Sequence, residues 1–196
     1  MERATLTAVV AEPEAFLSHE DPAVRRLAIS AGASRAAELI EPLAGLLATD
    51  PDPTVRAEAA EVLAHAGAPA LLSLDAARED ADPRVVEAVA TAYGEIGDET
   101  AVPWLVAQAA EGDDRLVREA AVASLGAIGA ERALPTLLAL VAAAPPQVRR
   151  RAVVALTAYD GPEVEAALRD ASTDRNPMVR EVAMMVVGRP ERGPDL

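Results

Sequence analysis

The chain has 196 residues and a formal net charge of −14 at pH 7, and its length fits one domain or a short array of repeats. Alanine, leucine and valine supply most of the apolar half of the composition, because only 2% of the residues are aromatic. This composition favours an all-helical protein over a sheet protein, whose strands prefer β-branched and aromatic residues. The acidic charge argues against binding to nucleic acid or to an anionic membrane surface. The lack of cysteine excludes disulfides, thiolate metal sites and cysteine nucleophiles.

The N-terminal sequence, MERATLTAVVAEPEAF, is a poor match to a signal peptide, because its apolar stretch is short and acidic residues flank it. No part of the sequence approaches the run of about 18 apolar residues that a membrane-spanning helix needs. We therefore expect a cytoplasmic protein that does not contact a membrane.

One short phrase, Asp-Pro-x-Val-Arg, returns along the whole chain. Its valine, taken as the register mark, recurs at Val24, Val55, Val85, Val117, Val148 and Val179. A near-constant period within the range of about 20–50 residues is the mark of a solenoid. The sequence predicts a single domain over residues 1–188 and a flexible tail over residues 189–196. The predicted repeat units lie near residues 12–34, 36–66, 68–97, 99–129, 131–160 and 161–188.

Each unit has the pattern of two helices, as the fourth unit and the start of the fifth illustrate. The stretch DDRLVREAAVASLGAIG begins with Asp113 or Asp114 as a helix N-cap and ends at Gly129. Its apolar residues recur at helical spacing: Val117, Ala121, Val122, Leu125 and Ile128. The stretch ERALPTLLALVAA predicts the next helix. Because neither helix is long enough to be stable alone, pair must stack on pair to bury a continuous core.

An arginine follows the register valine in five of the six units, and an aspartate or asparagine precedes it in the turn. The arginines are Arg25, Arg56, Arg118, Arg149 and Arg180, and the turn residues are Asp21, Asp52, Asp114 and Asn176. We expect each arginine to bond the turn carboxylate or carbonyl groups of its own repeat or a neighbouring one, as an Asp–Arg ladder. The ladder is broken twice, because Val86 replaces the arginine and Pro145 replaces the aspartate.

The pattern D-P-x-V-R-x-x-A-x-x-A-L-G-x-I-G, followed by a helix such as ALPTLLAL, resembles the HEAT repeat. More narrowly, it is similar to the short HEAT-like class found in phycobilin lyases and in many bacterial scaffold proteins. The resemblance covers about residues 12–188 and implies a right-handed α–α superhelix of about six helix pairs. It also implies that the helix starting with the Val-Arg phrase lines the concave side. It is specific for fold and weak for function, because the matching residues are packing residues.

On that helix, the exposed positions are the residue before the valine and those two, three, six and ten residues after it. They place five glutamates on the concave face of the second to fourth units: Glu58, Glu61, Glu87, Glu95 and Glu119. A basic and apolar patch follows in the last two units: Arg150, Arg151, Val154 and Met185, with Arg189 beyond them. Such a face fits a groove that selects a basic segment of a protein partner. A solvated acidic surface without a ligand has the same pattern.

Candidate catalytic and metal-binding residues are few. His19 and His65 are the only histidines, and His19-Glu20 resembles one His-Glu pair of the HEAT-like di-iron enzyme deoxyhypusine hydroxylase, a family that needs four such pairs. Neither histidine stands beside a recognisable nucleophile motif, and the glycines form no phosphate-binding loop. We therefore predict no catalytic residue, no cofactor and no metal site.

The sequence predicts a non-enzymatic scaffold or adaptor that binds another protein through the concave face of a HEAT-like solenoid. The alternative is a lyase- or isomerase-like enzyme of the same family that binds a small molecule or a chromophore. That alternative needs a cavity with aromatic and polar walls, whereas the four aromatic residues of this chain are scattered. The pattern does not set the oligomeric state.

Overall fold

The computed structural model describes the backbone of residues 3–188 and the side chains of residues 6–188. All regular secondary structure in this part of the chain is helical, which confirms the predicted all-α fold of stacked helix pairs. The chain divides into two compact units, residues 1–98 and residues 99–196. The predicted tail over residues 189–196, including Arg189, lies outside the described residues.

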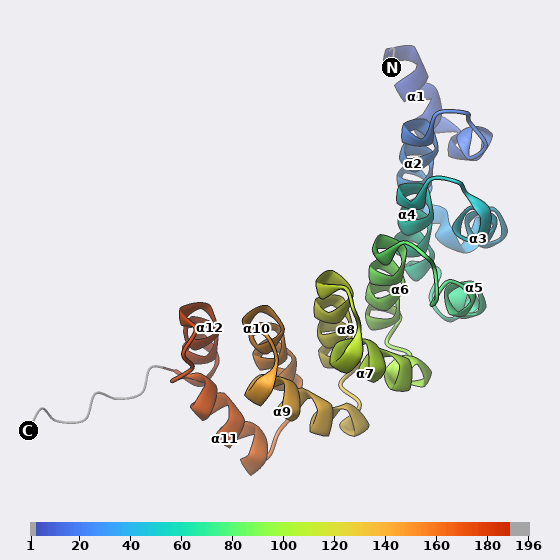
Figure 1. Ribbon diagram of the computed structural model, residues 1–196. Helices are drawn as coiled ribbons and strands as arrows, with labels where there is room; N and C mark the ends of the chain where they lie inside the picture. Colours follow the sequence, from blue (N-terminus) through green and yellow to red (C-terminus); the bar gives the residue numbers. More distant parts are fainter. Residues whose placement is uncertain (1–2, 189–196) are drawn as a thin grey trace, which may run out of the picture. The chain divides into compact units, whose positions relative to one another are not determined.

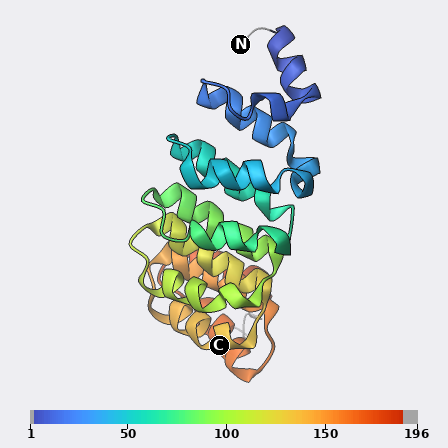
Figure 2. The ribbon, with the colours of Figure 1, turned by 90° about the vertical axis from the view of Figure 1, so that its right-hand side faces the viewer.

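The first unit has a short helical lead followed by two layers of helices (Figure 1). The lead consists of α1 (Arg3–Ala11) and the 3-10 helix η1 (Pro13–Phe16). One layer carries the repeated phrase and is called the Val-Arg layer: α2 (Pro22–Ala31), α4 (Pro53–Ala64) and α6 (Pro83–Ile96). The other layer contains η2 (Ala33–Glu38), α3 (Ile40–Thr49), η3 (Ala68–Ala70) and α5 (Leu71–Ala76). Figure 2 shows these pairs stacked in chain order.

The second unit is built in the same way. Its Val-Arg layer contains α8 (Arg115–Ile128), α10 (Pro146–Ala155) with η6 (Leu156–Ala158), and α12 (Pro177–Val187). Its other layer contains η4 (Glu99–Ala101), α7 (Val102–Glu111), η5 (Glu131–Ala133), α9 (Leu134–Ala143) and α11 (Pro162–Ala171). Within the unit, α10 packs between α8 and α12. The register valine is buried in every repeat of both units, so the period in the sequence is the period of the core.

The start of each Val-Arg helix is fixed by a capping side chain. The N-cap oxygen accepts the backbone N–H two residues further on, at 2.7 to 3.0 Å, in all but one of these helices. The caps are Asp21, Asp52, Asp82, Asp114 and Asn176. The exception is α10, where Pro145 stands at the cap. Each capping bond stabilises its helix by about 1 kcal/mol.

The Asp–Arg ladder exists, but its carboxylates are not the capping ones. Arg25 donates from Nε and Nη2 to Asp50 at 2.7 and 2.8 Å. In the same way Arg56 binds Asp80 at 2.8 Å in both bonds. Arg149 likewise binds the carboxylate of Asp174 at 2.8 and 2.7 Å. Each arginine therefore forks onto an aspartate of the following repeat, and the partners expected from the sequence, such as Asp52, are wrong for this role.

In each ladder turn, the capping side chain accepts an N–H at the start of its own helix, whereas the aspartate two residues earlier faces the arginine of the preceding repeat. Asp50 itself accepts the N–H of Asp52 at 2.9 Å, which fixes its orientation. Hydrogen bonds from Arg56 hold the pKa of Asp80 below its usual range. The side chain of Arg149 lowers the pKa of Asp174 in the same way.

Arg118 has no carboxylate partner in the ladder. The position that holds Asp50 in the second repeat corresponds to Ala143 in the fifth. Arg118 instead donates to the carbonyl oxygens of Ala109 and Ala110 at 3.2 and 3.3 Å. These acceptors are carbonyl groups in the last turn of α7, so Arg118 binds neither the turn carboxylate expected from the sequence nor a ladder aspartate.

Close contact between α8 and α10 depends on a glycine. A Cβ atom at Gly126 would lie 2.6 Å from Cα of Ala155 and 2.7 Å from its Cβ. We expect Gly126→Ala to lower the free energy of unfolding by about 1–3 kcal/mol, because the backbone of α10 must move. Gly45→Ala is the control, because a Cβ there meets nothing within 4 Å and should stabilise α3 by about 0.4–1 kcal/mol. Chemical denaturation of the two variants checks the opposite signs, and a neutral Gly126→Ala variant would contradict the close packing.

Candidate partner-binding groove

Two adjoining hollows lie on the first unit, over α2, α4 and α6. Their volumes are about 290 Å³ and 400 Å³, and both are lined by Glu58, Glu61 and Thr91. Glu87 lines the smaller one and Glu95 the larger one. Four of the five predicted glutamates therefore share one surface, which we call the acidic groove. Its further walls are Arg26, Ser30, Ala33, Thr54, Ala57, Val62, His65, Arg84 and Ala88.

Local structure explains why these carboxylates meet. Glu58 and Glu61 lie one turn apart on α4, and Glu87 and Glu95 lie two turns apart on α6. The residues between them, such as Ala59 and Val89, are buried in the core. Since α4 and α6 pack side by side, the outward faces of the two helices form one continuous surface.

Two arginines at the groove are already engaged. Arg26 donates to Glu58 at 3.2 Å, and the hydroxyl of Ser30 donates to the same carboxylate. Arg84 forks onto Asp82 at 2.9 and 2.8 Å and lowers the pKa of that carboxyl to about 2. The positive charge beside the groove is therefore held at Glu58 and Asp82.

Glu61 has no hydrogen bond or ion pair to any described residue. Glu61 is exposed to solvent at the groove, but partial desolvation of its carboxyl group raises its pKa, and the charges of Glu58, Glu95 and Glu87 add to this effect against the opposing charge of Arg26. After desolvation, the charges of three neighbouring glutamates contribute to the raised pKa, and Arg26 is the one positive charge that opposes them. A cationic group brought into the groove by a ligand would relieve this repulsion.

Glu119, the fifth predicted glutamate, belongs to the second unit and is neutralised within it. Arg115 approaches its carboxylate to 2.5 Å and Arg151 approaches it to 3.9 Å. The sequence contained the signal for the first pair, because Arg115 stands four residues before Glu119 on one helix face. This carboxylate differs from Glu61, which has no such partner.

The second predicted patch is divided between two places. Arg151 and Val154 line a hollow of about 240 Å³ between α8 and α10, whose other walls are small residues. Met185 is 72% exposed and lines a different hollow, of about 340 Å³, with Arg180 and Glu181 on α12. Arg150 is exposed and lines neither.

The histidines have structural surroundings. Nδ1 of His19 accepts the N–H of Asp21 at 3.0 Å, so it occupies the turn position that Asp50 fills in the next repeat. His65 lies at the edge of the acidic groove. No group of three His, Cys, Asp or Glu side chains within residues 3–188 is spaced to hold a metal ion. None of the helices in the described residues combines the length and the apolar character that crossing a bilayer requires.

The register places Arg26, Ser30 and His65 at outward positions of the same face, and they line the groove. They were not among the predicted partner-binding residues, because their charges and sizes follow no repeat. The signal available for the ladder was the spacing Asp-x-Asp-Pro or Asp-x-Asn-Pro, in which the first aspartate binds the arginine and the second residue caps the helix.

Known proteins share the fold of this chain. The family model of HEAT repeats matches residues 10–74 and 73–156. The chain is similar in structure to the complex of CpcE and CpcF of phycocyanin lyase from Nostoc sp., with a TM-score of 0.64 and 23% identity over 76% of this chain and 97% of that one. The Escherichia coli protein YibA matches with a TM-score of 0.67 and 18% identity, over 94% of this chain and 74% of that one. A search of curated proteins found no match to the sequence.

Proposed function

Because the chain belongs to the HEAT-repeat family, whose stacked helices present long binding surfaces, we propose that it is a non-enzymatic scaffold that binds another protein. The binding site is the acidic groove over α2, α4 and α6, and the ligand is a basic segment of the partner. The observation that carries the proposal is the uncompensated carboxylate of Glu61, which lies in hollows walled by three further glutamates.

The shape of the groove favours an extended cationic ligand over a single ion. The four carboxylates are spread over two hollows and two helices, and none of them belongs to a cluster that could hold a metal ion within the described residues. Arginine or lysine side chains spaced along a peptide can reach both hollows at once. Complementary charge gives such an encounter its specificity and its rate, and makes both depend on salt.

The test is a pull-down from lysate of source cells, with mass spectrometry, that compares three forms of the chain. The groove variant carries glutamine at positions 58, 61, 87 and 95. The matched control carries glutamine in place of Glu12, Glu20, Glu41 and Glu79, which are exposed and lie outside the groove. Both variants change the net charge by the same amount, so general acidity cannot explain a difference between them.

We expect a protein captured by the wild type and by the control to be lost from the groove variant, with unchanged helical circular dichroism. A synthetic arginine-rich peptide gives the same comparison with a defined ligand, and its affinity should fall at least about tenfold, a loss of about 1.4 kcal/mol. Equal capture by all three forms would move the binding site away from the acidic groove.

The pH dependence of peptide binding identifies the charge that matters. The pKa of Glu61 is raised, so this carboxyl is protonated at a higher pH than an ordinary glutamate. A cationic ligand favours the charged form, and its affinity should therefore fall as the pH is lowered from about 7 to about 5. Isothermal titration should show a flatter pH profile for Glu61→Gln than for the wild type.

The alternative function is a lyase- or isomerase-like activity on a small molecule or chromophore. The similar Nostoc structure is a phycocyanin lyase complex, but at 23% identity the likeness extends to the fold alone. The visible absorbance of the purified protein distinguishes the two functions. A bound chromophore that persists through size-exclusion chromatography would replace the scaffold proposal with the enzyme.

A further inference from the structure

A carboxylate-binding position is left open on α12. In α2, α4 and α10, the arginine of the phrase holds an aspartate of the following repeat through Nε and Nη2. Its Nη1 donates to carbonyl oxygens near its own turn. Arg180 makes only the second of these contacts. Its Nη1 donates to the backbone carbonyl oxygens of Asp174 and Arg175 at 2.7 and 3.1 Å. Among the described residues, Nε and Nη2 of Arg180 have no hydrogen-bond partner.

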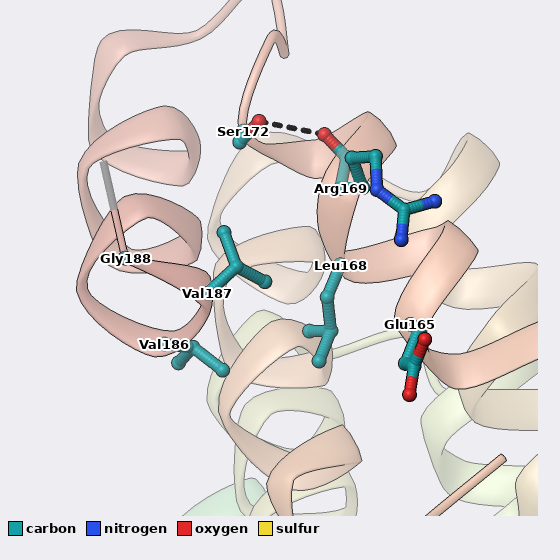
Figure 3. A pocket seen from close by; sticks show the side chains of 7 residues that line it. All are labelled: Glu165, Leu168, Arg169, Ser172, Val186, Val187 and Gly188. Carbon is teal, nitrogen blue, oxygen red and sulfur yellow. Dashed lines mark hydrogen bonds between the residues drawn. The ribbon is translucent and has the colours of Figure 1, made fainter. Parts of the chain in front are cut away.

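The same end of the unit has an open apolar face. The residues eight positions after the register valine are fully buried in other repeats: Leu63, Leu125 and Leu156. On α12 that residue is Val187, which is 42% exposed. Figure 3 shows Val187 beside Leu168 of α11. Both residues, with Val186, line a hollow of about 480 Å³. The face that a following helix covers elsewhere is therefore uncovered here within the described residues.

We infer that this end of α11 and α12 is a docking surface for a helical repeat of another protein that carries an aspartate in the turn before its packing helix. The aspartate accepts the two free donors of Arg180, in the geometry that Arg149 and Asp174 show one repeat earlier. The apolar side of the docked helices covers Val187 and the hollow. The guanidinium fork selects a carboxylate, because both groups are planar and the charges are opposite. This surface is separate from the acidic groove and does not rest on the proposed function.

A second copy of this chain does not fit this description. The first repeat presents His19 at the turn position where the other ladder turns have an aspartate, and Nδ1 of His19 already accepts the N–H of Asp21. The lead formed by α1 and η1 packs against α2, so the surface that a preceding repeat would contact is covered. The charge and the coverage of the first repeat both favour a different partner over head-to-tail assembly.

The decisive experiment supplies such a repeat in cis. A copy of residues 158–188 replaces residues 189–196, so that the copied Asp174 stands 25 residues after Arg180, as Asp174 stands after Arg149. We expect the helical circular dichroism signal to increase and the midpoint of chemical unfolding to rise. Changing the copied aspartate to alanine should lower that midpoint more in the Arg180 background than in the Arg180→Ala background, where it removes only the acceptor of a turn N–H, as Asp174 accepts that of Asn176.

A second experiment measures the binding of such a repeat as a separate peptide. A labelled peptide with the sequence of residues 158–188 is titrated by fluorescence anisotropy into the full chain and into a chain that ends at Gly188. We expect saturable binding to both, weakened at least about tenfold by Arg180→Ala or by loss of the peptide aspartate. Arg150→Ala is the control, because Arg150 is an exposed arginine outside this surface. Arg180→Lys keeps a donor for the turn carbonyls but lacks the two parallel donors of the guanidinium. It should therefore weaken peptide binding without unfolding the end of the chain.

Each failure has a definite meaning. Appended residues that stay non-helical, or docking that ignores both Arg180 and the aspartate, would overturn the inference. Peptide binding that appears only when residues 189–196 are removed would assign the surface to the chain's own C-terminal residues and overturn an external partner.

Discussion

Asp50→Ala is expected to lower the free energy of unfolding by about 3–5 kcal/mol, measured by chemical denaturation. The carboxylate of Asp50 holds two donors of Arg25, and the side chains are 3% and 9% exposed. Removing the aspartate leaves the guanidinium of Arg25 buried with only the carbonyl oxygens of His19 and Glu20. It also removes the acceptor of the N–H of Asp52. The large cost comes from the stranded charge, because an intact buried pair is itself worth little.

Two controls isolate that charge. Glu38→Ala removes an exposed ion pair with Arg35, at 2.9 Å, and should cost less than about 1 kcal/mol. The double variant Arg25→Met with Asp50→Ala should lose less stability than Asp50→Ala alone, because it buries no unpaired charge. The single variants Asp50→Ala and Arg25→Met complete the comparison. If the double variant loses as much free energy of unfolding as the two single variants together, the Arg25–Asp50 pair contributes through packing and not through charge.

The periodic part of the fold can be predicted from the sequence, because equivalent residues of each repeat pack in the same way. The register valines, the proline at the first turn and the final glycine of α8 all lie where the period places them. Gly129, for example, takes φ of 68° at the end of α8, a conformation that side chains other than glycine rarely adopt. These residues act locally, on their own helix or on the neighbouring one, so their roles are visible in one repeat.

The ladder was harder to read, because two aspartates compete for each arginine. Asp50 and Asp52 have the same side chain and lie in one turn, so composition cannot separate them. Both also accept a backbone N–H, Asp52 that of Thr54 at 2.8 Å and Asp50 that of Asp52 at 2.9 Å. Only the three-dimensional path of the turn shows which carboxylate faces Arg25.

The sequence predicted which glutamates face outward at the candidate groove, but not which of them have ion-pair partners. The register places Glu58 and Glu61 at outward positions of α4, and both line the hollows of the first unit. It could not show that Arg151 approaches Glu119, since these side chains belong to different helices. It also could not show that Glu61 has no ion-pair partner among the described residues, which is the property that makes the groove a candidate for a basic ligand.

Leu125→Ala is expected to lower the free energy of unfolding by about 4–5 kcal/mol, in the upper part of the range for buried leucine-to-alanine changes. Leu125 lies on α8 and is fully buried. The loss depends on whether neighbouring groups can collapse into the space that the side chain leaves. Here the backbones of α8 and α10 are already in contact beside it, at Gly126 and Ala155. The helices therefore cannot approach further, and the cavity stays open.

Leu116→Ala on the same helix is the matched control for this loss. Leu116 is 43% exposed, so its truncation removes little buried surface and should change the free energy of unfolding by less than about 0.5 kcal/mol. The two variants change the same residue type on one helix, and burial is the main difference between the two positions. A loss of less than about 2 kcal/mol for Leu125→Ala would mean that α8 and α10 can slide together, and that the contact at Gly126 does not fix their separation.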